Sequence, residues 1–115
     1  MALQIVRWEK GNEPPNKVFL EKELKGWGFR TEFWVDKPGT HYRDFRHPVD
    51  EIVWVLRGQA RIELEGESAT LAGGDRIRIP KDTRHSLEVV GAETLYWLAA
   101  FHKSGPRSSG RAGLR

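Results

Sequence analysis

The chain contains no cysteine and no long apolar run, and each absence excludes a class of protein. Without cysteine there are no disulfides, thiolate metal sites or cysteine nucleophiles. The apolar start of the chain, residues 1–6, is too short for a signal peptide or a membrane span and ends at Arg7. The 115 residues suffice for one domain with a real core, but not for two. We therefore expect a single cytoplasmic domain with no membrane partner.

Positive charge is concentrated at the carboxyl end. The chain has 19 Lys and Arg residues against 16 Asp and Glu, a formal net charge of +3. Four of the basic residues lie in residues 103–115, a segment without acids that is rich in Gly, Ser and Pro. Without them, residues 1–102 carry a net charge of about −1. We therefore expect a domain at 1–102 and a flexible basic tail at 103–115, with too few charges to favour nucleic acid.

Near the amino end, the segment from Asn16 to Lys25 has two interpretations. Two prolines before it, Leu20 and Leu24 four residues apart, and Gly26 as a stop all favour a short helix. Residues 17–20 could instead open a β-hairpin and add an extra strand. A short strand at residues 3–8 precedes this segment.

From Phe29 onward the pattern is β throughout. Short runs of alternating apolar and polar residues are separated by turn signals every 8–12 residues, including Pro38-Gly39, Glu65-Gly66-Glu67 and Gly73-Gly74. This spacing predicts an all-β sandwich or barrel. The expected strands include residues 29–34, 51–57, 60–65, 75–79, 85–90 and 94–101.

Two histidines and one glutamate form the candidate site. His47 and Glu51 are four apart in a β-like segment, so they share a face, and His85 ends a turn one hairpin later. A barrel could bring all three together. Two imidazoles and a carboxylate are suitable ligands for a divalent transition metal. His41 could add a fourth ligand only if the strand bends sharply, so we expect it at the rim.

The spacing of these residues resembles the two sequence motifs of the cupin superfamily. Gly39, five residues, Phe45-x-His47, three residues, Glu51, six residues and Gly58 is similar to the first motif. Gly74, five residues and Pro80-x-Asp82-x-x-His85 is similar to the second. The resemblance spans residues 29–101. It implies a single conical jelly-roll barrel in which His47, Glu51 and His85 bind one metal such as Zn, Fe, Mn or Ni.

Three positions depart from the motifs. Phe45 occupies the place of the first-motif histidine, Asp82 that of the turn glycine, and Val89 that of an asparagine. Asp82 is a mild change because aspartate tolerates left-handed backbone. With Phe45 in place of a histidine, there are two alternatives for the metal site. Either the metal keeps a face of two His and one Glu with open positions beside an apolar wall, or the phenyl ring fills the space and the barrel holds no metal.

Strand parity predicts the faces of the barrel. We expect an apolar pocket around the ligands. Its lining residues are Phe45, Tyr42, Val53, Val55, Ile77, Ile79 and Leu87, with Tyr42 near the mouth. Arg76 and Arg78 should point outward, opposite Glu63 or Glu65. A second apolar face, formed by Ile52, Trp54 and Leu56, requires cover from the amino-terminal segment or from a second copy, and a homodimer is our expectation.

The functional hypotheses fall into three classes. The first is a metal-dependent enzyme acting on a small molecule, dioxygenase-like or isomerase-like. The second is a module that binds a small ligand without turnover, and the third is a metal-free structural or interaction domain. No acid–base pair stands out beyond the ligand set, so the sequence leaves the choice between enzyme and binding module open.

Overall fold

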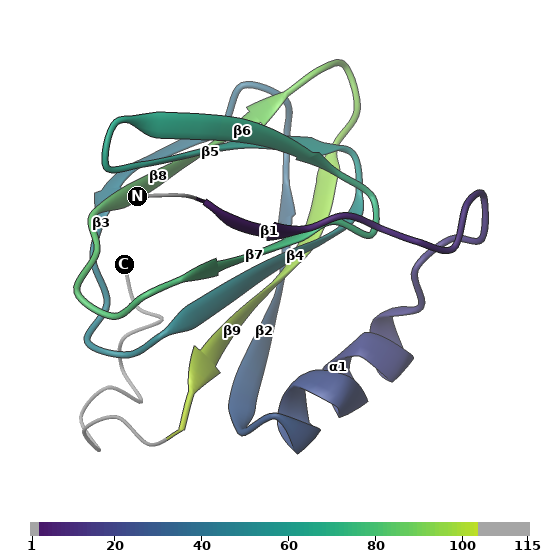
Figure 1. The fold of residues 1–115 in the computed structure, drawn as a ribbon. Helices are drawn as coiled ribbons and strands as arrows, with labels where there is room; N and C mark the ends of the chain where they lie inside the picture. The colour runs from purple at the N-terminus through teal and green to yellow at the C-terminus, as the bar shows by residue number, and fades with distance from the viewer. Residues whose placement is uncertain (1–2, 104–115) are drawn as a thin grey trace.

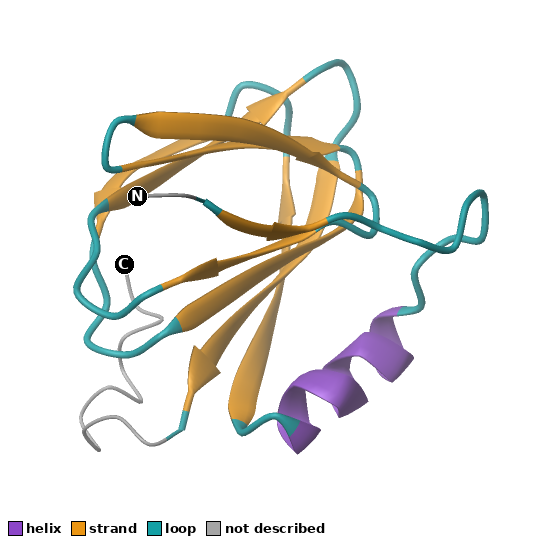
Figure 2. Cartoon of the chain, viewed as in Figure 1, coloured by secondary structure: helices purple, strands orange, loops and turns teal. Residues whose placement is uncertain are grey.

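The computed structural model describes residues 3–103 and shows a two-layer β-barrel with one helix outside it (Figures 1 and 2). One sheet has the strand order β1-β7-β4-β9-β2 and the other β3-β8-β5-β6, and all pairs are antiparallel. The prediction of an all-β jelly roll is confirmed. In chain order the elements are β1 Gln4–Val6, α1 Lys17–Gly26, β2 Phe29–Asp36, β3 His41–Phe45, β4 Glu51–Arg57, β5 Gln59–Leu64, β6 Glu67–Ala72, β7 Arg76–Ile79, β8 His85–Val90 and β9 Leu95–His102.

The core lies between the inner faces of the two sheets. Alternation along the strands puts every second side chain inside, as in β5, where Ala60, Ile62 and Leu64 are buried and the residues between them are exposed. The predicted inward-facing residues Val53, Val55, Ile77, Ile79 and Leu87 are all at most 4% exposed and belong to this cluster. Tyr42 packs against it from the edge.

The segment after Pro15 is the helix α1. Its first turn is capped by the Asn16 side chain, which accepts a hydrogen bond from the Phe19 backbone N–H at 2.9 Å. Lys17 and Glu21 form the expected i,i+4 ion pair at 3.0 Å. The helix buries Leu20 and Leu24, and the hairpin alternative is therefore wrong.

α1 covers the second apolar face of the barrel. Its two buried leucines form one cluster on the outer face of the larger sheet, together with Phe29, Ile52, Trp54, Leu98 and Ala100. Leu56 packs at the margin of this cluster. Of the two covers expected for the face, the structure shows the amino-terminal segment, so these residues no longer support a dimer.

The predicted partners of Arg76 and Arg78 are wrong. β7 lies between β1 and β4, in the other sheet from Glu63, so neither arginine can face Glu63 or Glu65. Arg78 instead pairs with Asp50 at 2.7 Å. The Arg76 guanidinium lies 4.9 Å from the Trp54 ring centre, a cation–π contact on the outer face. Sequence alternation identified the outward direction, but not which strand lies alongside.

A bulge in β3 changes the parity of its residues. Tyr42 pairs with Leu87 and Phe45 with His85, so two residues of β3, Arg43 and Asp44, lie opposite the single residue Ser86 of β8. Asp44 lies in this bulge and has a left-handed backbone, with φ 57°. Tyr42 and Phe45 therefore both turn inward, while His41, opposite Glu88, turns away from the core. This geometry removes His41 from the ligand set.

Two turn residues of the predicted motifs have a left-handed backbone. Gly58 has φ 91°, and a Cβ there would lie 2.6 Å from the Thr94 carbonyl oxygen, so only glycine fits. Asp82 has φ 61°, the left-handed conformation expected at the place of the motif glycine. The hairpin turn between β5 and β6 falls at Glu65-Gly66, as predicted.

The amino-terminal strand is shorter than predicted, covering residues 4–6 of the expected 3–8, because the chain then turns to Asp75. The Asp75 carboxylate accepts hydrogen bonds from the backbone N–H of Trp8 and of Ala72, each at 2.9 Å, and from Arg7 at 3.0 Å. Burial raises the pKa of this carboxyl, but these donors outweigh burial and hold it below its usual range. Asp75 thus joins the first strand to the β6–β7 turn.

Within residues 3–103, no helix is long and apolar enough to cross a membrane. The flexible basic tail expected at 103–115 lies, beyond Lys103, outside the described residues. The last described backbone bonds of β9 run from His102 N–H to the Asp50 carbonyl at 2.9 Å and from Lys103 N–H to the Gly28 carbonyl at 2.8 Å.

Candidate metal centre

The structure brings His47, Glu51 and His85 together at one end of the barrel. Glu51 is the first residue of β4 and His85 the first of β8, so the two sheets each supply one side chain. His47 lies in the connection between β3 and β4, outside any strand. The parity argument that joined it to Glu51 therefore fails, although the residues do meet. All three are buried, with exposed fractions of 5%, 2% and 6%.

The Glu51 carboxylate lies between the two imidazoles. Its Oε1 atom is 3.2 Å from His85 Nε2 and 3.4 Å from His47 Nε2. The same Oε1 atom is buried and accepts no hydrogen bond. A buried carboxylate oxygen without a donor is costly, because desolvation removes the water that would stabilise its charge. A cation placed between the three side chains would offset this cost.

One hydrogen bond fixes the orientation of the His85 ring. His85 Nδ1 lies 2.9 Å from the Thr83 carbonyl oxygen. A carbonyl only accepts, so Nδ1 carries a proton, and Nε2 is the ring nitrogen that faces Glu51 and would bind a metal. Metal-binding histidines commonly have this arrangement, in which a backbone acceptor fixes the tautomer.

Backbone contacts hold the segments that carry the three residues. The Asp82 N–H donates to the His47 carbonyl at 2.7 Å and so ties the loop before β8 to the loop before β4. Asp50, beside Glu51, accepts from Arg78 at 2.7 Å and from the Lys81 N–H at 2.8 Å. Burial raises the pKa of the Asp50 carboxyl, but these two donors, together with the charges of Arg78 and His102, hold it below its usual value. Asp50 thus connects the start of β4 to Arg78 in β7 and to Lys81 in the loop after β7.

The donor set fits a divalent transition metal. The three ligand atoms lie within 4.8 Å of one another, and no larger cluster of this kind exists among the described residues. Ligands about 2.0–2.2 Å from one ion stand roughly 3–3.5 Å apart, which the two measured separations match. Two nitrogens and one carboxylate oxygen suit Zn, Fe, Mn or Ni.

Aromatic rings surround the three side chains. The Phe45 ring centre is 6.1 Å from that of His47 and 6.4 Å from that of His85. Phe101 meets His47 edge to face at 5.0 Å. Tyr42 lies behind Phe45, at 5.5 Å. Phe45 therefore stands beside both imidazoles, where the motif comparison predicted a replaced ligand.

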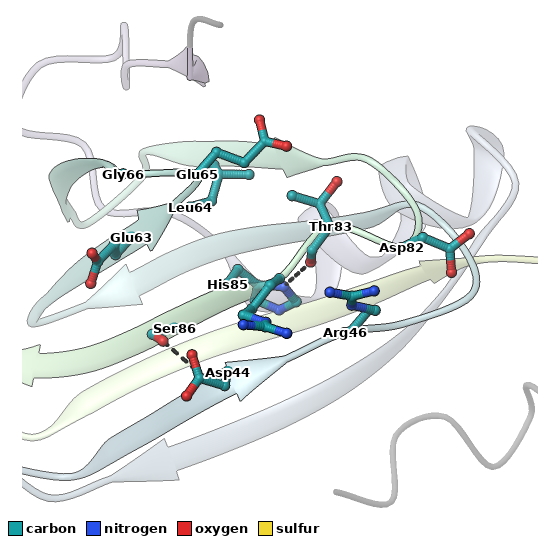
Figure 3. A pocket seen from close by; sticks show the side chains of 11 residues that line it. Asp44, Arg46, Glu63, Leu64, Glu65, Gly66, Asp82, Thr83, His85 and Ser86 are labelled. Atoms are coloured by element: carbon teal, nitrogen blue, oxygen red, sulfur yellow. Dashed lines mark hydrogen bonds between the residues drawn. The ribbon is translucent and has the colours of Figure 1, made fainter.

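A cavity of about 520 Å³ is lined in part by His85 (Figure 3). It lies over the outer face of the smaller sheet, since Ser86 and Glu63 alternate with the inward-facing His85 and Leu64. The Asp44 backbone N–H donates to Ser86 Oγ there at 3.0 Å. None of the predicted pocket residues lines it. Its lining is Asp44, Arg46, Glu63, Leu64, Glu65, Gly66, Asp82, Thr83, Arg84, His85 and Ser86.

Sequence reasoning assigned no role to the inward face of β2. Arg30 pairs with Phe101 and Glu32 with Ala99, both members of the inner cluster, so the polar residues of this strand point inward. The apolar Phe33 points outward and is 44% exposed. The signal was present, because charged residues alternate with apolar ones there, but alternation alone does not say which set is inside.

Comparisons with known proteins agree with this architecture. A family model described as "Cupin domain" matches residues 32–101. A polyketide synthase, CurC, of Streptomyces cyaneus is 34% identical over 60 residues, which are 51% of this chain and 39% of that protein. The chain thus spans well under half the length of this curated relative.

Solved structures share the fold. A cupin 2 domain-containing protein from Halorhodospira halophila has a TM-score of 0.68 at 22% identity, covering 93% of this chain and 81% of that one. Salicylate 1,2-dioxygenase from Pseudoaminobacter salicylatoxidans has a TM-score of 0.61 at 18% identity, covering 76% and 23%. The family match extends over more than half of the chain and includes the segments that carry the three clustered residues. The chain belongs to the cupin family.

Proposed function

We propose that this cupin binds one divalent transition metal through His47, Glu51 and His85 and uses the site to bind or transform a small molecule. The observation that carries the proposal is the buried Glu51 Oε1 atom, without a hydrogen-bond donor and 3.2 and 3.4 Å from two imidazole nitrogens. A bound metal would supply positive charge and Lewis acidity at this point.

The residues of the chain would orient and enclose such a ligand. Phe45 and Phe101 form apolar walls beside the imidazoles and keep water away from them. We extend the proposed lining to Tyr42, Val53, Val55, Ile77, Ile79 and Leu87, which reach the barrel interior. The fold relatives include a dioxygenase and a lyase, each named for a small-molecule reaction. The dioxygenase agrees with a dioxygenase-like metal-dependent enzyme, whereas neither name bears on the isomerase-like alternative.

Metal analysis of three proteins tests the proposal. The wild type, purified without chelator or a metal-binding tag, should carry close to one metal per chain. Glu51→Gln keeps the shape of the side chain but removes its charge, and should lose most of the metal. His41→Ala is the matched control, since His41 turns away from the core, and should keep it.

Two results would contradict the proposal. A wild type that stays metal-free after incubation with Zn²⁺, Fe²⁺, Mn²⁺ or Ni²⁺ would leave the metal-free binding module as the better description. Retention of metal by Glu51→Gln would place the metal elsewhere in the chain.

A further inference from the structure

Two arginines lie side by side on the outer face of the larger sheet, next to its edge strand β1 (Figure 1). They are Arg76 and Arg78 of β7, and strand pairing places each of them in a row across the sheet. One row is Val6, Arg76 and Trp54, and the other is Gln4, Arg78 and Ile52. Residues two apart on a strand are separated by about 6.6 Å along it, so the two positive charges are close neighbours. Such like charges destabilise each other unless an anion lies near them.

The two guanidinium groups differ in what they contact. Arg78 donates to the Asp50 carboxylate at 2.7 Å. Arg76 lies over two indole rings, with its guanidinium carbon 5.1 Å from the ring centre of Trp27 and 4.9 Å from that of Trp54. Within residues 3–103, no hydrogen bond or ion pair engages the Arg76 guanidinium. Its five N–H donors are therefore not used by the described chain, and the two rings restrict the directions in which they point.

A cavity of about 430 Å³ lies beside these arginines, between β1 and Trp27 at the carboxyl end of α1. We call it the β1 cavity. The described residues that line it include Arg76 and Arg78 but no carboxylate. Val6 and Trp27, which are 40% and 43% exposed, add apolar walls. None of the three candidate metal ligands lines the β1 cavity, so it is separate from the metal centre.

We propose that the β1 cavity binds a small organic anion, whose carboxylate or phosphate group is held by Arg76 and whose apolar part lies against Trp27 and Val6. Carboxylates and phosphates match the planar fork of donors on a guanidinium and accept two hydrogen bonds from it. The carboxyl end of α1 carries a partial negative charge that opposes an anion at Trp27, so the expected affinity is modest. The site does not depend on a bound metal and is additional to the proposed function.

NMR titration of the ¹⁵N-labelled full chain with benzoate, phenyl phosphate and benzamide tests the proposal. The three probes share a phenyl ring, but only the first two carry a charged oxygen group. At least one of these two anions should shift the Trp27 indole N–H signal to saturation, with a dissociation constant of about 1 mM. Benzamide should bind at least about tenfold more weakly, because it lacks the charge-assisted pair. The anion with the higher affinity identifies the preferred charged group.

Val6→Glu is the most direct variant, because it places a carboxylate beside Arg76 in the same row, at a position that is already exposed. It should abolish binding of both anions and leave the melting temperature unchanged. Val18→Glu makes the same change at an exposed position of α1 and is the matched control, which should bind as the wild type does. Arg76→Gln should lower the affinity at least about tenfold, and Arg76→Lys should lower it less, because lysine keeps the charge without the fork of donors.

Three results would overturn the proposal: no saturable shift of the Trp27 signal with either anion, equal affinity for benzamide, or anion binding that survives Val6→Glu. The same titrations on Glu51→Gln separate the β1 cavity from the metal centre. Anion binding should persist in that variant, and its loss there would assign the anion to the metal and overturn the proposal. Because metal content is measured independently, the proposed function and this inference can fail separately.

Discussion

Phe45 is the residue whose replacement most directly probes the metal centre. Its ring stands beside both imidazoles, at 6.1 and 6.4 Å between ring centres. Phe45→His would add an imidazole at the edge of the existing donor set. We expect the variant to bind Zn²⁺ more tightly, by about tenfold or more, since a fourth ligand adds a bond on a preformed scaffold. Competition titration against a chromophoric chelator measures the change.

Phe45→Leu is the control for this prediction, because it removes the ring without adding a donor. Its zinc affinity should stay close to that of the wild type. If Phe45→His does not bind zinc more tightly than Phe45→Leu does, a side chain at position 45 lies too far from the metal to act as a ligand.

Asp75 should make stability depend on pH. The pKa of its carboxyl is lowered in the folded chain, so the unfolded chain takes up a proton first as the pH falls. The stabilisation by Asp75 is therefore complete above the unfolded pKa of about 3.9 and is lost as the pH falls through the lower folded value. Asp75→Asn should cost about 1–3 kcal/mol at pH 7, since three bonds lose their charge-assisted acceptor.

Urea unfolding at several pH values measures this effect. The free energies of unfolding of the wild type and of Asp75→Asn should differ most at neutral pH and should converge as the pH falls below about 4. A constant difference across the whole range would mean that Asp75 contributes through shape alone.

At the level of elements, α1 closes the outer face of the larger sheet. Trp54 is 2% exposed, stacks on Trp27 at 5.7 Å and donates from Nε1 to the Gly74 carbonyl at 2.8 Å. Trp54→Ala should lower the free energy of unfolding by about 3–5 kcal/mol, a typical cost for a buried aromatic. Thermal unfolding by circular dichroism measures it. Phe33→Ala, at an exposed position of the same sheet, should change stability far less.

Trp54→Glu should prevent folding, because the carboxylate would be buried without a partner. A folded Trp54→Glu variant that changes only its oligomeric state would contradict the packing of α1 and restore this face as an interface between copies.

The elements show which parts of the molecule the sequence could predict. Turn residues such as Gly58 and Asp82 have a local cause, a backbone conformation that few side chains adopt, so their positions were predictable. The inward face of β2 and the bulge at Asp44 were not, because a period of two does not identify the buried face and one extra residue reverses it. His47 lies in a loop that brings it close to Glu51. The motif spacing predicted this proximity, whereas the argument from strand parity does not apply to a loop residue.

For the whole molecule, the remaining question is whether two copies associate. The face first expected to pair is covered by α1. Another apolar face lies on β2 and β9, the outer end of the larger sheet, where Phe33, Val35 and Tyr96 are 44%, 49% and 36% exposed. Phe33 and Tyr96 stack at 6.5 Å, so the patch is continuous. An exposed apolar patch on an edge strand favours association.

We therefore expect a homodimer through this patch, and Phe33→Glu to yield monomers at micromolar concentration. A carboxylate within an apolar interface loses its hydration in the dimer and keeps it in the monomer, so it disfavours association by several kcal/mol. Sedimentation velocity compares the wild type with Phe33→Glu and with Val18→Glu, an exposed apolar position on α1 that serves as control. A monomeric wild type, or a Phe33→Glu variant that stays dimeric, would rule out this interface. Because Phe33 faces away from the barrel interior, metal content should be the same in all three proteins, which makes assembly and metal binding separable properties of the same sheet.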